Sequence, residues 1–148
     1  MNQASLFNEI VHKYLLNENI KWWGKKKLKQ RHARNVLNYL EKIQIEMVPD
    51  RKKRSDFIIS LTVKPGREEK LHLVIKSLLL QNILPEKIIL WIAADEFQTE
   101  RLPSQLLALR NEVFEVKEIS ENLKSYNKIL PALDQYGDKL IITADDDI

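Results

Sequence analysis

Three consecutive carboxylates, Asp145 to Asp147, follow an apolar run and are the residues of this sequence best suited to chemistry. Adjacent carboxylates repel one another, so they need solvent or a cation to neutralise them. If the run is a strand, alternation sends Asp145 and Asp147 to one side, about 7 Å apart. Such a pair suits Mg²⁺ or Mn²⁺, which proteins bind through one or two carboxylates together with substrate phosphates. A solvated acidic loop is the alternative, and the position at a strand end makes it the less favoured one.

Two lysines four residues apart, Lys124 and Lys128, are a second candidate. If a helix begins here, the two side chains share one helix face. Ammonium groups beside a helix N-terminus favour phosphate. Taken alone, however, two such lysines are more often solvated surface residues.

The segment from Thr62 to Arg67 is a third candidate, because it joins an apolar run to a helical pattern through Pro65 and Gly66. Proline and glycine shape the backbone of such a turn. The guanidinium of Arg67 either binds a phosphate or is a solvent-exposed group at the start of the helix. The segment alone does not decide between these two interpretations.

An alternation of strands and helices after residue 55 positions these candidates. Apolar runs predict strands, and three- and four-residue spacing predicts the helices between them. The strands are expected at 57–63, 87–93, 114–119 and 139–144, and the helices from 67, at about 103–111 and at about 125–135. This order predicts an α/β fold with a mostly parallel sheet of about four strands, covered on both faces. Ligands of such sheets bind beyond the carboxyl ends of the strands, here 62–67, 94–97 and 145–147.

The first 54 residues differ in charge and periodicity from the rest. They hold 13 Lys/Arg and 5 Asp/Glu, a net charge of +8, whereas residues 55–148 hold 11 and 16, a net charge of −5. Apolar spacing predicts one helix over 6–15 and another over about 28–46, and we expect a linker at 49–54. Trp22 and Trp23, among lysines, either pack where these helices meet, which we favour, or contact a membrane surface or nucleic acid.

Composition excludes several other kinds of chemistry. The chain of 148 residues suits one ordinary domain, and its lack of cysteine rules out disulfides, thiolate metal sites and cysteine nucleophiles. Its three glycines stand far apart, so glycine-rich phosphate loops are absent. No apolar run approaches the ~18 residues of a membrane span, and the N-terminus lacks the order of a signal peptide. We therefore expect a cytoplasmic protein, at the inner face of the membrane if the N-terminal segment binds it.

Residues 56–148 resemble nucleotide-diphospho-sugar glycosyltransferases of the GT-A fold, most closely the family-2-like enzymes of bacterial surface polysaccharide synthesis. The run 57–62 resembles the first strand of that family, and 85–90 resembles the second. The series Arg67, Leu71, Ile75, Ser77-Leu78-Leu79 and Gln81 reproduces the family's R-x-x-x-L-x-x-x-I-x-S-L-L-x-Q helix. The acidic triplet matches the D-x-D metal motif.

The resemblance implies a Rossmann-like fold of GT-A type and a metal-dependent sugar transferase. Asp145 and Asp147 would hold Mn²⁺ or Mg²⁺. The nucleotide-diphosphate sugar would contact Thr62, Pro65, Arg67, Lys124, Lys128 and Asp145. The metal would bridge the diphosphate, Asp145 would hold the ribose or the metal's water, and a glycan or lipid-linked acceptor would receive the sugar.

Two departures from the family narrow this expectation. The second strand ends with Ile92-Ala93 where the family has acidic residues that touch the base, and Asp95 comes two residues late. The family's acceptor-binding half and catalytic base lie downstream of the acidic motif, beyond Ile148. We therefore expect 55–148 to be the donor-binding half of a glycosyltransferase domain, inactive by itself and with an unknown catalytic residue, preceded by a basic helical extension at 1–54.

Other functions stay open at this stage. A nucleotide-binding remnant without transfer activity would keep the same pocket. The basic segment 1–54 would instead suit a nucleic-acid or membrane module, with nucleic acid the less favoured partner. Phosphate contacts make nucleic-acid binding fall steeply with salt, whereas a helical cap on the sheet would show no such binding.

Overall fold

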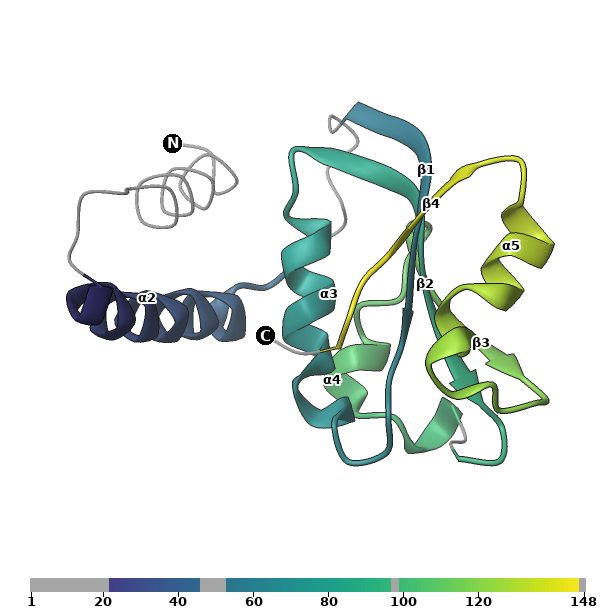
Figure 1. The fold of residues 1–148 in the computed structure, drawn as a ribbon, viewed down its shortest axis with the longest axis horizontal. Helices are drawn as coiled ribbons and strands as arrows, with labels where there is room; N and C mark the ends of the chain where they lie inside the picture. Colours follow the sequence, from purple (N-terminus) through teal and green to yellow (C-terminus); the bar gives the residue numbers. More distant parts are fainter. Residues whose placement is uncertain (1–21, 46–52, 97–98, 147–148) are drawn as a thin grey trace. The chain divides into compact units, whose positions relative to one another are not determined.

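The computed structural model describes residues 22–45, 53–96 and 99–146, in two compact units, Met1–Gln44 and Ile45–Ile148. The described element of the first unit is helix α2, Trp22–Lys42 (Figure 1). It begins six residues earlier than expected, because 22–27 contain only one helix-weakening residue, Gly24, and several lysines that form helices well. The helix expected over 6–15 lies outside the described residues. In the described ranges, no helix is long and apolar enough to cross a bilayer.

The second unit is built on a four-stranded sheet in which every pairing is parallel. Its strands are β1 (Lys53–Thr62), β2 (Ile83–Ala93), β3 (Phe114–Ile119) and β4 (Leu140–Thr143), in the spatial order β3-β2-β1-β4. The expected α/β fold with a parallel sheet is therefore confirmed. β1 begins at Lys53, so the last residues expected in the linker already belong to the sheet.

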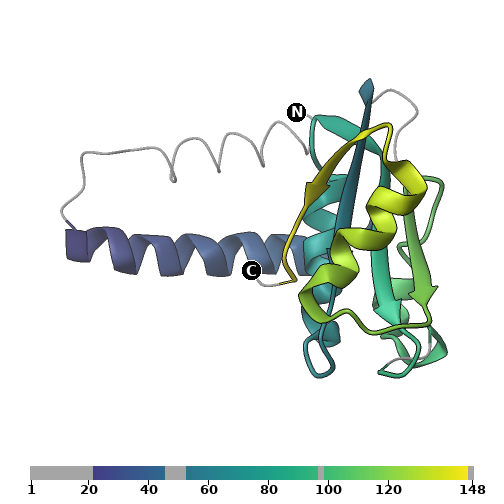
Figure 2. The same ribbon diagram turned by 45° about the vertical axis from the view of Figure 1, so that its right-hand side comes forward.

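Helices cover both faces of the sheet, as Figures 1 and 2 show. On one face, α3 (Leu71–Leu79) and α4 (Ser104–Leu107) pack over a core that includes Leu61 and Leu90. On the other face, α5 (Leu130–Tyr136) lies over a smaller cluster. That cluster is made of Ile58, Ile89, Trp91 and Ala132. Each inner strand is buried on both sides, which explains why its sequence is an almost continuous apolar run.

Two connecting segments and the start of one strand differ from their sequence-based expectations. The helix expected over 125–135 is divided into a 3₁₀ segment, η3 (Lys124–Lys128), and α5, because Pro131 fits only the first turn of an α-helix. The helix expected over 103–111 is only the four residues of α4. β2 begins before Pro85, and its pairing with β1 is irregular there because proline has no N–H to donate. Two further short 3₁₀ segments are η1 (Glu68–Lys70) and η2 (Thr99–Arg101).

Candidate functional site

A cleft of about 540 Å³ lies at the carboxyl ends of β1 and β4. Its walls come from the turn after β1, from η3 and from the residues after β4, with Glu96 contributed by the turn after β2. The lining residues are Thr62, Val63, Lys64, Pro65, Arg67, Glu96, Lys124, Ser125, Asn127, Lys128, Asp145 and Asp146. This is the edge at which parallel sheets bind their ligands.

The cleft gathers the site residues that the sequence singled out. Those it brings together are Thr62, Pro65, Arg67, Lys124, Lys128 and Asp145. The remaining one, Asp147, lies outside the described residues. Because β4 ends at Thr143, strand alternation does not extend into the acidic triplet, and the neighbours Asp145 and Asp146 both line the cleft.

The turn after β1 presents Arg67 to the cleft. The N–H of Arg67 donates to the carbonyl of Lys64 at 3.1 Å, and Gly66 has a φ of +88°. Proline second and glycine third, with φ positive at the glycine, are the residues that a type II turn requires. The Arg67 Nη1 atom then lies 3.2 Å from Oδ1 of Asp146, which ties the turn to the end of β4.

Each described carboxylate of the cleft forms an ion pair with a lysine or arginine. Lys128 forms an ion pair with Asp145, and its hydrogen bond and positive charge lower the pKa of that carboxyl group. Asp146 pairs with Arg67 through one oxygen, while its other oxygen, Oδ2, is buried and has no hydrogen-bond partner among the described residues. Lys124 Nζ lies 3.5 Å from the Glu96 carboxylate. The cleft therefore combines cations with carboxylates of unequal exposure.

A buried hydrogen-bond chain fixes the position of η3. The Trp91 indole N–H donates to Ser60 Oγ at 2.9 Å, and Ser60 Oγ donates to the carbonyl of Lys128. Both Ser60 and Trp91 are fully buried, so each polar group needs its partner. The N–H of Ala144 donates to the carbonyl of Ser60 at 3.0 Å, so one residue of β1 holds both the η3 wall and the β4 wall.

Two asparagines shape the loop that carries Lys124. Asn127, which is 3% exposed, accepts from the N–H of Leu123 at 2.7 Å, and Asn122 accepts from the N–H of Lys124 at 2.9 Å. Lys124 itself has a φ of +57°. The expectation that Lys124 and Lys128 share an α-helix face is therefore wrong, since Pro131 delays the α-helix and Lys124 is left-handed. Both lysines reach the cleft from a 3₁₀ segment instead.

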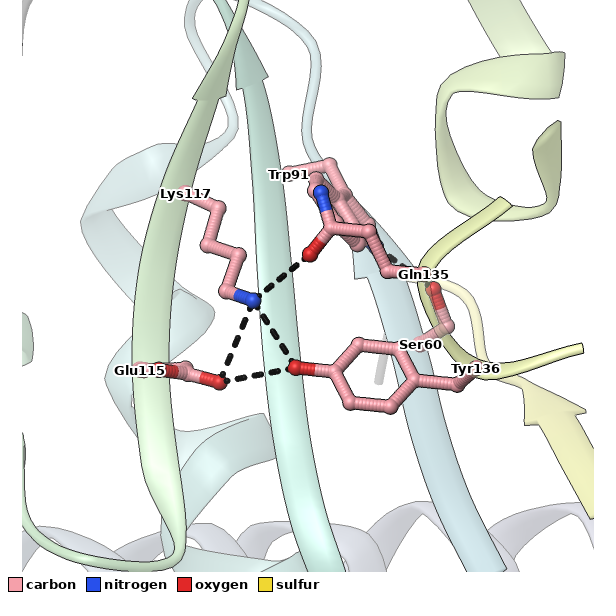
Figure 3. A network of polar contacts seen from close by, with 6 residues as sticks. All are labelled: Ser60, Trp91, Glu115, Lys117, Gln135 and Tyr136. Carbon is pink, nitrogen blue, oxygen red and sulfur yellow. Dashed lines mark hydrogen bonds and ion pairs between the residues drawn. The ribbon is translucent and has the colours of Figure 1, made fainter. Parts of the chain in front are cut away.

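Helix α5, which follows η3, is anchored by Lys117 of β3 (Figure 3). The Lys117 ammonium donates to Gln135 Oε1 at 2.7 Å and to Tyr136 Oη at 2.8 Å, and lies 3.7 Å from the Glu115 carboxylate. It also lies 5.0 Å from the centre of the Tyr136 ring and 5.6 Å from that of Trp91, within cation–π range. This half-buried lysine makes two hydrogen bonds and one ion pair, so we assign it to structure.

The carboxylates of the cleft suit a hard divalent cation. Carboxylate oxygens are the ligands that Mg²⁺ and Mn²⁺ prefer. Within 22–45, 53–96 and 99–146, no three His, Cys, Asp or Glu side chains form a group that could hold a metal. The buried and unpartnered Asp146 Oδ2, however, is an oxygen that a cation would satisfy. Asp145 and Asp146 therefore supply carboxylate oxygens of the kind such a cation uses, but the described residues hold no complete ligand set.

Sequence reasoning missed several residues of the site. Ser60 was visible as a single polar residue inside an apolar run, which is a signal of a buried hydrogen bond. Strand alternation predicts that Asp146 points away from Asp145, but β4 ends at Thr143 and Asp146 lines the cleft. Glu96 falls within the predicted ligand-binding range 94–97, although its contact with Lys124 depends on how distant segments meet. Asn127 lies next to Lys128, and its contacts with Leu123 and Asn122 are local.

Comparisons with known proteins do not assign the chain to a family. No protein-family model matches it, and neither does any curated protein or solved structure.

Proposed function

We propose that the cleft binds a nucleotide-diphosphate sugar together with Mn²⁺ or Mg²⁺, as the donor site of a GT-A-type glycosyltransferase. The observation that carries this proposal is the meeting of Arg67, Lys124 and Lys128 with Asp145 and Asp146 at one edge of a parallel sheet. A diphosphate needs cations, and a divalent metal needs carboxylates. The resemblance of residues 56–148 to these enzymes supports the same reading.

Each wall of the cleft has a role in this function. Arg67, Lys124 and Lys128 would neutralise phosphate oxygens, and the turn at 62–67 would contact the nucleoside. Asp145 and Asp146 would hold the metal, joined by Asp147 of the D-x-D motif. When bound, the metal stabilises the negative charge that grows on the departing diphosphate. A hydroxyl of a glycan or lipid-linked acceptor is the proposed nucleophile, and we assign its base to no residue of the cleft.

Nucleotide binding should depend on a divalent metal. We expect calorimetry with uridine diphosphate to show binding in Mn²⁺ that weakens at least tenfold in chelator, because the metal neutralises charge that otherwise repels the phosphates. Asp147→Asn should abolish this dependence. Asp95→Asn, which removes an exposed carboxylate outside the cleft lining, is the matched control. Equal affinity with and without Mn²⁺, or no binding by folded protein, would contradict the proposal.

We propose further that the first unit contacts an anionic membrane, where lipid-linked acceptors would lie. Helix α2 starts with Trp22-Trp23 and holds seven Lys or Arg against one Glu. Each Lys or Arg near an anionic surface contributes about 1 kcal/mol, and tryptophan settles at the headgroup level.

We expect the whole chain to co-sediment with vesicles that contain anionic lipid but not with neutral ones. Binding should weaken as salt rises, because exposed charges are screened. It should also fall when Trp22 and Trp23 are replaced by alanine. If the native chain stays in the supernatant with anionic vesicles at low salt, the membrane proposal is wrong.

A further inference from the structure

Two of the three cations proposed to bind phosphate are already paired with the two described aspartates proposed to bind metal. Lys128 contacts Asp145, and Arg67 contacts Asp146 at 3.2 Å. In each pair the cation comes from η3 or the turn after β1, and the carboxylate follows β4. We call these the exchange pairs.

We propose that the exchange pairs couple the two ligands of the cleft: a divalent cation that takes the aspartates releases Lys128 and Arg67 to the diphosphate, and the diphosphate likewise releases the aspartates to the metal. This inference rests on the proposed function and adds to it a form of regulation. The ligand-free pairs compete with either ion when it binds alone, and the two ions together replace both partners.

The exposure of the pairs allows such an exchange. The Asp145 side chain is 72% exposed and that of Lys128 is 23% exposed, so solvent reaches the pair from the aspartate side and can replace the lysine there.

The second pair, Arg67 with Asp146, favours replacement of the arginine by a metal. The Asp146 side chain is 11% exposed, and its Oδ2 atom has no partner among the described residues, although Arg67 holds Oδ1. Leaving one oxygen of a largely buried carboxylate without a hydrogen-bond partner costs free energy. A metal bound to Asp146 would remove this cost, which the single contact with Arg67 does not. Arg67 is 56% exposed and is free to turn toward a phosphate.

Exchange pairs predict that removing one member tightens binding of the ligand that competes with it. A site whose residues only bind ligands predicts weaker binding or no change. If Lys128 competes with the metal for Asp145, removing the lysine should tighten binding of Mn²⁺ alone while weakening binding of uridine diphosphate. If Asp145 competes with phosphate for Lys128, removing the carboxylate should tighten binding of uridine diphosphate in chelator. Each ligand should strengthen the other by the same factor, about 5- to 150-fold.

The experiment titrates Mn²⁺ alone, uridine diphosphate in chelator, and each in the presence of the other, by calorimetry on the whole chain. Lys128→Met and Asp145→Asn are compared with Lys64→Met and Asp95→Asn. Lys64 lines the cleft but has no ion pair among the described residues, so its removal changes the charge without releasing an aspartate. Unchanged thermal unfolding shows that each variant is folded.

We expect Lys128→Met to tighten binding of Mn²⁺ alone about threefold or more beyond Lys64→Met, with Asp145→Asn tightening metal-free nucleotide binding beyond Asp95→Asn. Both variants should reduce the coupling factor. The exchange is wrong if each variant behaves as its control does, or if the native chain binds both ligands independently. If the native chain binds neither ligand, the proposed function fails and the exchange fails with it.

Discussion

Replacing Trp91 by alanine is expected to lower the free energy of unfolding by about 3–5 kcal/mol. Trp91 is fully buried between the sheet and α5, where it packs with Ile58, Ile89 and Ala132. The substitution removes this packing and also leaves Ser60 Oγ without its donor. Urea unfolding followed by circular dichroism measures the change, and a loss below about 1 kcal/mol would contradict the packing of Trp91 against α5.

Trp91→Phe separates the packing of the ring from its hydrogen bond. Phenylalanine keeps most of the apolar contact but has no N–H to donate to Ser60. We expect a smaller loss of stability than for alanine, together with several-fold weaker binding of uridine diphosphate, because Ser60 holds the carbonyl of Lys128. Native nucleotide affinity in Trp91→Phe would show that this chain of hydrogen bonds does not position η3.

The double substitution Arg67→Gln and Lys128→Gln should weaken binding of uridine diphosphate in saturating Mn²⁺ by about 100-fold or more. A hydrogen bond to a charged group contributes roughly 1.5–3 kcal/mol, which is about tenfold or more in affinity for each residue. Glutamine keeps a polar side chain at both positions and removes only the charge. Calorimetry on the purified chain measures the loss directly.

The control for this pair is Arg101→Gln with Arg110→Gln, which removes the same charge from exposed positions outside the cleft lining. It should change nucleotide affinity less than threefold, because exposed charges at a distance are screened by salt. If the two double variants lose affinity equally, net charge rather than the cleft explains the binding. Retained affinity in the cleft variant would remove Arg67 and Lys128 from the site.

The sheet was predictable because its signals are local. Runs such as 57–62 and 87–93 are continuous and apolar, as strands buried on both faces must be. Parallel strands bind ligands beyond their carboxyl ends, and the cleft lies there. The start of β2 was missed because Pro85 is rare inside a strand, and here the pairing with β1 becomes irregular to accommodate it.

The interior of the site was not predictable from local patterns. Ser60 meets Trp91 and Lys128, which are 31 and 68 residues away in the chain. Such contacts depend on how the strands and η3 pack, and no periodicity encodes them. The same is true of Asp146, whose burial follows from where β4 ends rather than from the acidic triplet.

At position 124, the residue that is best for stability differs from the residue that is best for the proposed ligand binding. A side chain in the left-handed region costs roughly 1–2 kcal/mol that glycine avoids. Glycine would therefore be the more stable residue at 124, yet it would remove an amine from the cleft wall. A search for stabilising substitutions by unfolding alone would select against the proposed function here, so position 124 is a place where thermostability and activity have to be screened together.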